Sequence, residues 1–358
     1  MSQKRFRVAV VGVTGAVGRE LLTILQQRKF PVGELVGFAS ARSVGREFKF
    51  GGNSLQCKPL QPGCFDGVDF AFFDASDAVS KEWVPVAAQA GAWVIDNSAT
   101  FRMDSTVPLL VPEINGHLLE ERVRRGVRQI APSERVFAGP NCSTVELVLA
   151  LKPIRDRWGL KRVVVSTYQS TSGAGSAAMD ELTDQTRGVL EGREVPAKAF
   201  SHRIAFNCIP QIGGFKSDGY TSEEQKIMEE SRKILALPSL RISATAVRVP
   251  TYSGHGESVN VECERPFELA EVRSSWLSQS GIIVQDEPQS GIYPMNVTHE
   301  GDRVEGAGGR DAVYVGRLRR DTSVDHGLNF WVVSDNLRKG AALNAVQIGE
   351  AIIQSSAF

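Results

Sequence analysis

The stretch FRVAVVGVTGAVG, residues 6–18, decides the fold class. Its first half, Phe6–Val11, is apolar and β-branched apart from Arg7, which is typical of a strand buried on both faces of a parallel sheet. A glycine turn with the spacing GxxGxxG follows, and residues 20–27 have the apolar spacing of an amphipathic helix. Together these features predict a dinucleotide-binding unit, in which a pyrophosphate approaches the helix N-terminus. Because the spacing departs from GxGxxG, a turn that serves only packing is an alternative interpretation.

Further buried strands are predicted in the first half at residues 35–38, 68–74 and 92–96, and a helix over residues 80–90 separates the last two. Strands that alternate with helices in this way are typical of a doubly wound parallel sheet. We therefore expect an α/β fold of the Rossmann type, with ligands bound at the carboxyl ends of the strands.

The second half predicts a mixed α+β domain. Its β-branched runs predict strands at residues 161–169, 242–249, 313–316 and 328–333. A final helix is expected over residues 337–354, after a cap formed by Ser334-Asp335-Asn336. We place the cofactor domain at residues 1–138 plus 337–358, and the second domain at residues 139–336.

Composition excludes several classes of function. Lys and Arg together number 41 and so do Asp and Glu, which argues against nucleic acid or an anionic membrane surface as the main partner. Five cysteines without a CxxC pair argue against a disulfide framework and a thiolate zinc site, so no metal is expected. No apolar run approaches the roughly 18 residues that span a bilayer, and the start of the chain lacks the apolar region of a signal peptide. We expect a soluble, cytoplasmic protein.

The end of the second strand, SARS at residues 40–43, bears on the choice of cofactor. An NAD enzyme usually places an acidic residue here, whose carboxylate holds the ribose 2′-hydroxyl. This chain has Ser40, Arg42 and Ser43 instead, and the nearest preceding acid, Glu34, lies at the opposite end of the strand. Because arginine pairs well with a phosphate, we favour NADP over NAD. A solvated surface arginine is the alternative interpretation.

GPNCST, residues 139–144, carries the strongest signal for chemistry. Asn141 is a good N-cap residue, and it would place Cys142 in the first turn of a helix that continues through the apolar run 145–158. The main-chain N–H groups and the helix dipole there favour an anion and lower the pKa of a thiol. A thiolate is the nucleophile that acyl transfer needs. The alternative is a small apolar residue buried at a helix start.

Three further positions suit a polar small-molecule site. Arg102 follows a predicted strand end, Gln169 ends another strand just before Ser172 and Gly173, and His255 lies between two glycines. A glutamine amide can orient a carbonyl group, and an imidazole titrates near neutral pH, as general acid–base catalysis requires. A surface charge for Arg102 and a simple loop after Gln169 are the competing interpretations.

Glu223 and Lys226 lie three residues apart in a predicted helix capped by Thr221 or Ser222, and therefore on one helix face. In isolation they are most simply a capping acid and a solvated salt bridge. Arg248 lies in the next predicted strand.

Eight segments, in one colinear order across nearly the whole chain, resemble the aspartate-β-semialdehyde dehydrogenase family. They are VAVVGVTGAVG (8–18), SARS (40–43), DNSATFR (96–102), PNCST (140–144), STYQSTSGAG (166–175), YTSEEQK (220–226), RVPTYSGH (248–255) and WVVSDNLRKGAA (331–342). The departures from the family pattern are Ala99-Thr100, Gln225 and the two glycines that flank His255. They remove no charged or nucleophilic group, so they bear on orientation rather than on chemistry.

The resemblance implies a role for each matched residue. Cys142 would be the nucleophile, His255 the acid and base, and Gln169 the residue that orients the substrate. The substrate-binding positions would be Glu223 and Arg248 at the amino acid end, and Arg102, Asn141 and Lys226 at the phosphate. The NADP-binding positions would be Gly12, Thr14, Gly15, Ala16, Val17, Ser40, Arg42, Ser43, Ser172, Gly173 and Asn336.

The reaction that the resemblance implies is the NADPH-dependent reductive dephosphorylation of L-β-aspartyl phosphate to L-aspartate semialdehyde and phosphate, through a Cys142 thioester. It belongs to the biosynthesis of lysine, threonine and methionine, and the family forms homodimers, with a tetramer as the alternative. N-acetyl-γ-glutamyl-phosphate reductase is the nearest rival, which the Asn-Cys-Ser order and Gln169 disfavour. A catalytically silent paralogue is the rival of another class, and it would be expected to lose Cys142, Gln169 or His255.

Overall fold

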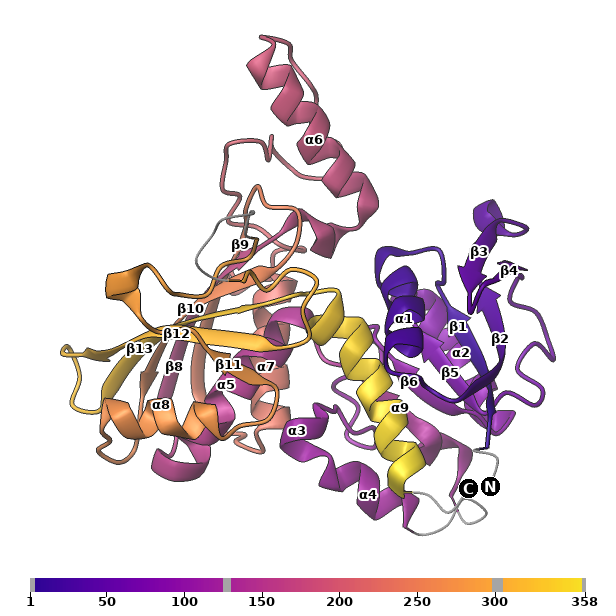
Figure 1. Ribbon diagram of the computed structural model, residues 1–358, viewed down its shortest axis with the longest axis horizontal. Coiled ribbons are helices and arrows are strands. Elements are labelled where there is room, and N and C mark those ends of the chain that lie inside the picture. Colours follow the sequence, from indigo (N-terminus) through magenta and orange to yellow (C-terminus); the bar gives the residue numbers. More distant parts are fainter. Residues whose placement is uncertain (1–3, 125–129, 298–304, 356–358) are drawn as a thin grey trace. The chain divides into compact units, whose positions relative to one another are not determined.

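The computed structural model describes residues 4–124, 130–297 and 305–355. The chain divides into two compact units: unit 1 comprises residues 1–141 and 341–358, and unit 2 comprises residues 142–340. Figure 1 shows the helices and strands of both units with their labels. The domain boundaries predicted from the sequence lie close to those of the two units.

Unit 1 is built on a parallel sheet with the strand order β2-β1-β5-β6-β7. The strands are β1 (Phe6–Val11), β2 (Val32–Phe38), β5 (Phe70–Phe73), β6 (Trp93–Asp96) and β7 (Val136–Ala138). Successive residues of β1 point to opposite faces of the sheet, and Val8, Ala9, Val10 and Val11 are all buried. A strand buried on both faces needs helices on both sides, and the doubly wound α/β fold is confirmed.

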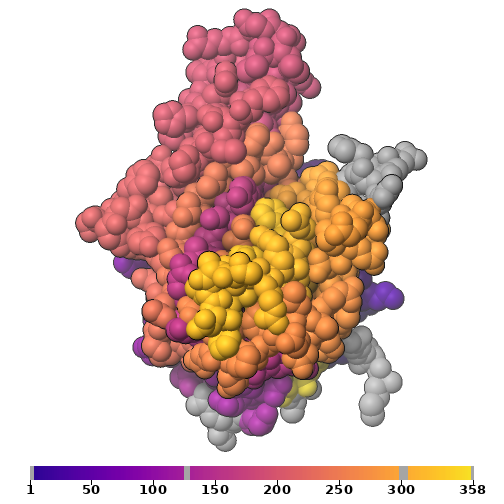
Figure 2. All heavy atoms as spheres, turned by 90° about the vertical axis from the view of Figure 1, so that its left-hand side faces the viewer, coloured from indigo at the N-terminus to yellow at the C-terminus, as the bar shows by residue number. Residues whose placement is uncertain are grey.

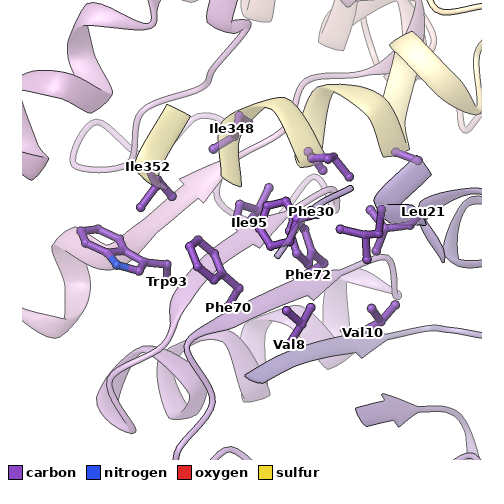
Figure 3. Close-up of a cluster of buried hydrophobic side chains, with 14 of the residues drawn as sticks. Val8, Val10, Leu21, Phe30, Phe70, Phe72, Trp93, Ile95, Ile348 and Ile352 are labelled. Carbon is purple, nitrogen blue, oxygen red and sulfur yellow. The ribbon is translucent and has the colours of Figure 1, made fainter. Parts of the chain in front are cut away.

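The helices of unit 1 form two layers around this sheet. They are α1 (Ala16–Gln27), α2 (Asp77–Gln89), α3 (Pro112–Asn115), α4 (His117–Val123) and α9 (Leu343–Ser355). On one face, Ile348 and Ile352 of α9 lie over Phe30, Phe70 and Trp93, as Figure 3 shows. On the other face α2 packs against β5 and β6. A short hairpin, β3 (Glu47–Phe50) with β4 (Asn53–Gln56), follows β2 and was not predicted.

Unit 2 contains a mixed sheet with the strand order β11-β12-β13-β10-β8-β9. The strands are β8 (Arg162–Gln169), β9 (Arg241–Arg248), β10 (His255–Glu262), β11 (Ile282–Val284), β12 (Val313–Asp321) and β13 (Gly327–Ser334). β8 and β9 are parallel, whereas β10 is antiparallel to both β8 and β13. The predicted α+β domain is therefore confirmed, and its central strand β10 is one that the sequence analysis did not predict.

Helices α5 (Cys142–Trp158), α7 (Ser222–Ile234) and α8 (Leu269–Leu277) pack together against this sheet (Figure 1). α5 is the central helix of the layer, and residues 143–151 of it are all buried. The predicted start of this helix at Cys142 is confirmed. Side chains on the opposite sheet face are more exposed, and there the rings of Tyr168 and Trp331 lie 5.3 Å apart.

A segment built on α6 (Ser176–Leu190) extends away from the sheet of unit 2, as Figures 1 and 2 both show. It has a small apolar cluster of its own, formed by Leu182, Ile204, Ala205 and Ile209. Glu181 holds the returning chain by accepting hydrogen bonds from the main-chain N–H groups of Lys198 and Ala199.

The C-terminal helix differs from its prediction. Ser334 belongs to β13, and Asp335 is the residue that caps, because its Oδ1 accepts hydrogen bonds from the N–H groups of Leu337 and Arg338. A π-helical turn (Arg338–Ala342) then precedes α9. The predicted loop of residues 291–309 lies partly outside the described residues, at 298–304. Among the described residues no helix has the length and apolar character needed to cross a membrane.

Candidate active site

His255 opens β10 and its side chain is completely buried in unit 2. The main-chain N–H of Ser170 donates to His255 Nδ1 over 3.1 Å, which leaves the ring proton on Nε2 in the neutral tautomer. Nε2 has no hydrogen-bond partner among the described residues. Burial, followed by the nearby Arg248 guanidinium, lowers the pKa of His255 to about 3. The resting imidazole is therefore neutral at neutral pH, and its Nε2–H is the ring group that can donate to a substrate.

A compact polar network holds this region of unit 2 in place. Asn336 Oδ1 accepts hydrogen bonds from the hydroxyl groups of Ser170 and Ser172 and from the main-chain N–H of Gly254. Asn336 and both serines are buried. The network joins the end of β8, the turn before β10 and the residues after β13, so it fixes the position of His255.

Arg248 links to the same site through the main chain of Ser170. Its Nη1 donates to the Ser170 carbonyl oxygen over 2.6 Å, while the N–H of that residue contacts His255. Arg248 also lines a cavity of about 240 Å³, together with Phe200 and Ile212. Burial lowers the pKa of Arg248, and the negative charges of Cys142 and Glu223 oppose that effect.

Gln169, Glu223 and Lys226, which were predicted separately, form one connected group. Gln169 Nε2 donates to Glu223 Oε1 over 3.3 Å, and Lys226 Nζ lies 3.7 Å from Glu223 Oε2. α7 carries two of these residues, and its N-cap is Thr221 in a capping box with Glu224. The Glu223–Lys226 ion pair of the plainer interpretation is present, but only its lysine end is partly exposed, at 37% of the side chain, because Glu223 is buried.

Cys142 occupies the first position of α5 and is half-buried. Gly340 makes room for it, because a methyl group there would lie 2.8 Å from Cys142 Cβ. Gly173 plays the same part for the base: an added Cβ would lie 2.9 Å from Arg248 Nη1 and 3.3 Å from His255 Nε2. Unit 2 thus gathers a thiol at a helix start, a neutral imidazole and a buried guanidinium.

In unit 1 the glycine turn has the shape that a phosphate-binding turn requires. Gly12 has φ +91°, and a Cβ there would lie 1.9 Å from the Asp74 carbonyl oxygen. A Cβ at Gly18 would lie 2.3 Å from the Gly12 carbonyl oxygen. Gly15 precedes the first residue of α1, so the turn leads directly into a helix N-terminus, where anions bind. Thr14, Ala16 and Val17 belong to the same turn.

Residues 40–43 follow β2 at its carboxyl end, where Ser40 and Arg42 are exposed and Ser43 is half-buried. Glu34, at the other end of the strand, lies 3.2 Å from Arg7. The acidic residue nearest before this turn is therefore engaged elsewhere in unit 1.

Arg102 is buried, so the alternative interpretation, that it is a surface charge, is wrong. Its Nη2 donates to the Asn97 carbonyl oxygen over 2.6 Å. Asn141, the last residue of unit 1, is buried as well.

Ser170 was not predicted as a site residue, although its main chain contacts both Arg248 and His255. Its position directly after Gln169, at the end of a predicted strand, was the sequence feature that could have indicated it. No group of three or more His, Cys, Asp or Glu side chains within the described residues is arranged to hold a metal ion.

Comparisons with known proteins identify the family of the chain. A family model described as the NAD binding domain of semialdehyde dehydrogenase matches residues 7–122, and one described as its dimerisation domain matches residues 151–339. Aspartate-semialdehyde dehydrogenase of Aquifex aeolicus is 47% identical to the chain over 351 residues, which is 98% of each protein. The chain belongs to the aspartate-semialdehyde dehydrogenase family.

Two further members of the family show the same full-length likeness. The Bacillus subtilis aspartate-semialdehyde dehydrogenase is 42% identical over 353 residues, 96% of each chain. The crystal structure of aspartate semialdehyde dehydrogenase II from Vibrio cholerae, complexed with ASA, has a TM-score of 0.89 at 43% identity and covers 98% of this chain and 99% of its own. The predicted family and fold class are both confirmed.

Proposed function

We propose that this chain catalyses the NADPH-dependent reductive dephosphorylation of L-β-aspartyl phosphate to L-aspartate semialdehyde and phosphate. The observation that carries the proposal is the grouping in unit 2 of Cys142 at the start of α5, the neutral His255 and the buried Arg248. Full-length likeness to aspartate-semialdehyde dehydrogenases supports the same substrate.

The first chemical step is acyl transfer to Cys142. Cys142 reacts as the thiolate, after its proton has passed to solvent, and attacks the acyl carbon of the substrate. The new C–S bond forms as the C–O bond to phosphate breaks, which leaves a thioester on Cys142. A guanidinium that acts electrostatically on Cys142, as Arg248 does, favours the thiolate.

Bound NADPH would supply a hydride to the thioester carbon of Cys142, and His255 would pass its Nε2 proton to the oxygen that gains negative charge, which gives a thiohemiacetal. His255 would take this proton back as the C=O bond re-forms and the C–S bond breaks, so that the aldehyde leaves and Cys142 returns to the thiolate. In this scheme the Gln169–Glu223 pair orients the substrate, and Arg248 binds its carboxylate through a charge-assisted hydrogen bond. Lys226, Arg102 and Asn141 stay the predicted phosphate-binding residues.

We propose NADP rather than NAD as the cofactor because of the turn after β2. Arg42, between two serines, offers a guanidinium to a 2′-phosphate, and the exposed side chains of Ser40 and Arg42 are accessible to one. The glycine turn in front of α1 would hold the pyrophosphate. Ser172, Gly173 and Asn336 stay the predicted contacts from unit 2.

We further propose that the protein is a homodimer. The match of residues 151–339 to a dimerisation domain supports this, and so does the sheet face of unit 2 that carries Tyr168 and Trp331. A half-exposed aromatic pair on a sheet that is covered on one side is a suitable core for an interface.

The function is tested by the reduction of NADP⁺ with L-aspartate semialdehyde, with and without inorganic phosphate. The proposal predicts reduction that requires phosphate. Activity with the N-acetylated glutamyl semialdehyde and none with aspartate semialdehyde would assign the chain to the rival reductase. No activity with either, from folded protein that binds NADP, would indicate the silent paralogue.

A further inference from the structure

Two glutamates that the proposed mechanism does not use are completely buried next to each other in unit 2. Glu146 lies on α5, one helical turn after Cys142, and Glu257 lies on β10, two residues after His255. Residues four apart on a helix, or two apart on a strand, point the same way. α5 also packs directly against β10 and β13. The pair therefore lies where the helix of the nucleophile meets the strand of the base.

Within the described residues, no N–H or O–H group donates a hydrogen bond of good geometry to the four carboxyl oxygens of this pair. The groups that act on the two carboxyls are each other and Ser334, whose hydroxyl and N–H face Glu146 and favour its ionised form. No lysine, arginine or histidine is among them.

Burial raises the pKa of both carboxyl groups well above the usual range, and the Glu257 charge raises that of Glu146 further. Two buried carboxylates without a cation cannot both stay ionised, because neither the desolvation nor the repulsion is offset. One proton between them removes the repulsion and supplies a hydrogen bond, since the protonated carboxyl donates to the carboxylate.

We propose that Glu146 and Glu257 share one proton. The resulting carboxyl–carboxylate hydrogen bond fixes the start of α5 on β10. Both glutamates are therefore positioning residues for Cys142 and His255. The positioning role rests on the proposed function of those two residues, whereas the shared proton does not. A displacement of about 1 Å at reacting groups can cost around a hundredfold in rate, so a rigid link here has a catalytic effect.

The shared proton is tested first without any activity measurement. Infrared spectra of the unliganded enzyme should contain the C=O band of a protonated carboxyl group, and Glu146→Gln and Glu257→Gln should each remove it. Glu181→Gln, which alters a largely buried glutamate on α6 that accepts main-chain hydrogen bonds, is the matched control and should leave the band in place. A C=O band that remains in both Glu146→Gln and Glu257→Gln would overturn the shared proton.

Thermal stability against pH gives a second readout. Carboxyl groups whose pKa is raised in the folded protein hold protons there that the unfolded chain releases, so stability falls as the pH rises above about 4.5. In Glu146→Gln the amide donates permanently to Glu257, so this fall should be smaller than in the wild type and in Glu181→Gln. Identical pH profiles in all three proteins would contradict the proposal.

The positioning role is tested by comparing a conservative with a disruptive substitution. Glu146→Gln keeps a donor and should retain kcat within about twofold, whereas Glu146→Leu leaves Glu257 without a donor and should lower kcat tenfold or more with KM little changed. If Glu146→Leu does not fold, the double variant Glu146→Leu/Glu257→Leu, which removes both buried carboxyls, takes its place and should show the same loss of kcat. Wild-type kcat in the folded leucine variant, or equal losses in the glutamine and leucine variants, would refute the positioning role.

Discussion

Gly173 shows at the scale of a single residue how the site depends on a missing side chain. A Cβ there would lie 2.9 Å from Arg248 Nη1 and 3.3 Å from the His255 ring, so either the loop or both side chains must move. We expect Gly173→Ala to lower kcat by about ten- to a hundredfold through misplacement of the base.

The matched control for this substitution is Gly214→Ala, where an added methyl group meets nothing within 4 Å. Steady-state kinetics and thermal melting of both variants make the comparison. Equal kcat in the two variants would show that the space beside His255 is not needed for turnover.

Arg42 carries the choice between the two nicotinamide cofactors. If its guanidinium pairs with the 2′-phosphate, Arg42→Ala should weaken NADPH binding about tenfold and NADH binding less than twofold, since a hydrogen bond to a charged group contributes about 1.5–3 kcal/mol. Calorimetric titration with both cofactors measures this. Equal losses for NADPH and NADH would mean that Arg42 does not contact the 2′-phosphate.

At the scale of elements, the glycine turn between β1 and α1 lies beside a carboxyl group with an unusual pKa. A Cβ at Gly15 would lie 3.6 Å from Asp74 Oδ2. Burial, and then the Asp96 charge, raise the pKa of Asp74 to about 6, although the Gly18 N–H opposes the shift. In the unfolded chain this carboxyl releases its proton near pH 4, as an ordinary aspartate does.

The folded protein therefore binds a proton at Asp74 between about pH 4 and pH 6 that the unfolded chain does not, and stability falls as the pH rises through this range. Asp74→Asn removes the effect, so its melting temperature should rise relative to the wild type as the pH goes from 4 to 7. Asp66→Asn, at an exposed position of unit 1, is the control and should follow the wild type. If the difference in melting temperature between Asp74→Asn and the wild type stayed constant from pH 4 to 7, the raised pKa of Asp74 would be contradicted.

The elements that the sequence predicted best are those with strong apolar patterns. β1 was predicted with its observed bounds, and α5 with its start at Cys142, because a strand buried on both faces and a helix buried all round have dense apolar runs. β10 was missed because His255, Gly256, Glu257 and Ser258 interrupt the apolar signal, although three of these four residues are buried. The π-helical turn before α9 depends on the packing of the folded unit, which no local pattern encodes.

The candidate site was predictable residue by residue but not as a set of contacts. Cys142 has a local signal because it lies at a predicted helix start, and His255 has one because glycines flank it. The contact between Gln169 and Glu223 joins residues 54 positions apart, so it needs the register of β8 and the cap of α7. Glu146 and Glu257 lie on two elements that only the tertiary fold brings together.

At the scale of the whole molecule, the proposed dimer depends on the open face of the unit 2 sheet. Tyr168 is 39% exposed there, beside Trp331. If this face forms the interface, association of Tyr168→Glu would bury a charge, which is unfavourable. The mass measured by sedimentation should then fall from that of two chains towards that of one. Leu277→Glu, an exposed position on α8 in the helical layer, should leave this mass unchanged. A monomeric wild type, or an unchanged Tyr168→Glu dimer, would place the contact elsewhere.

The central claim is that Cys142 forms a thioester with the substrate. Mass spectrometry of the intact protein after incubation with L-β-aspartyl phosphate, in the absence of NADPH, tests it most directly. We predict an aspartyl adduct that peptide mapping places on Cys142, and no adduct in Cys142→Ala, a variant that should still bind NADP. An adduct that persists in Cys142→Ala, or turnover by that variant, would contradict the covalent mechanism.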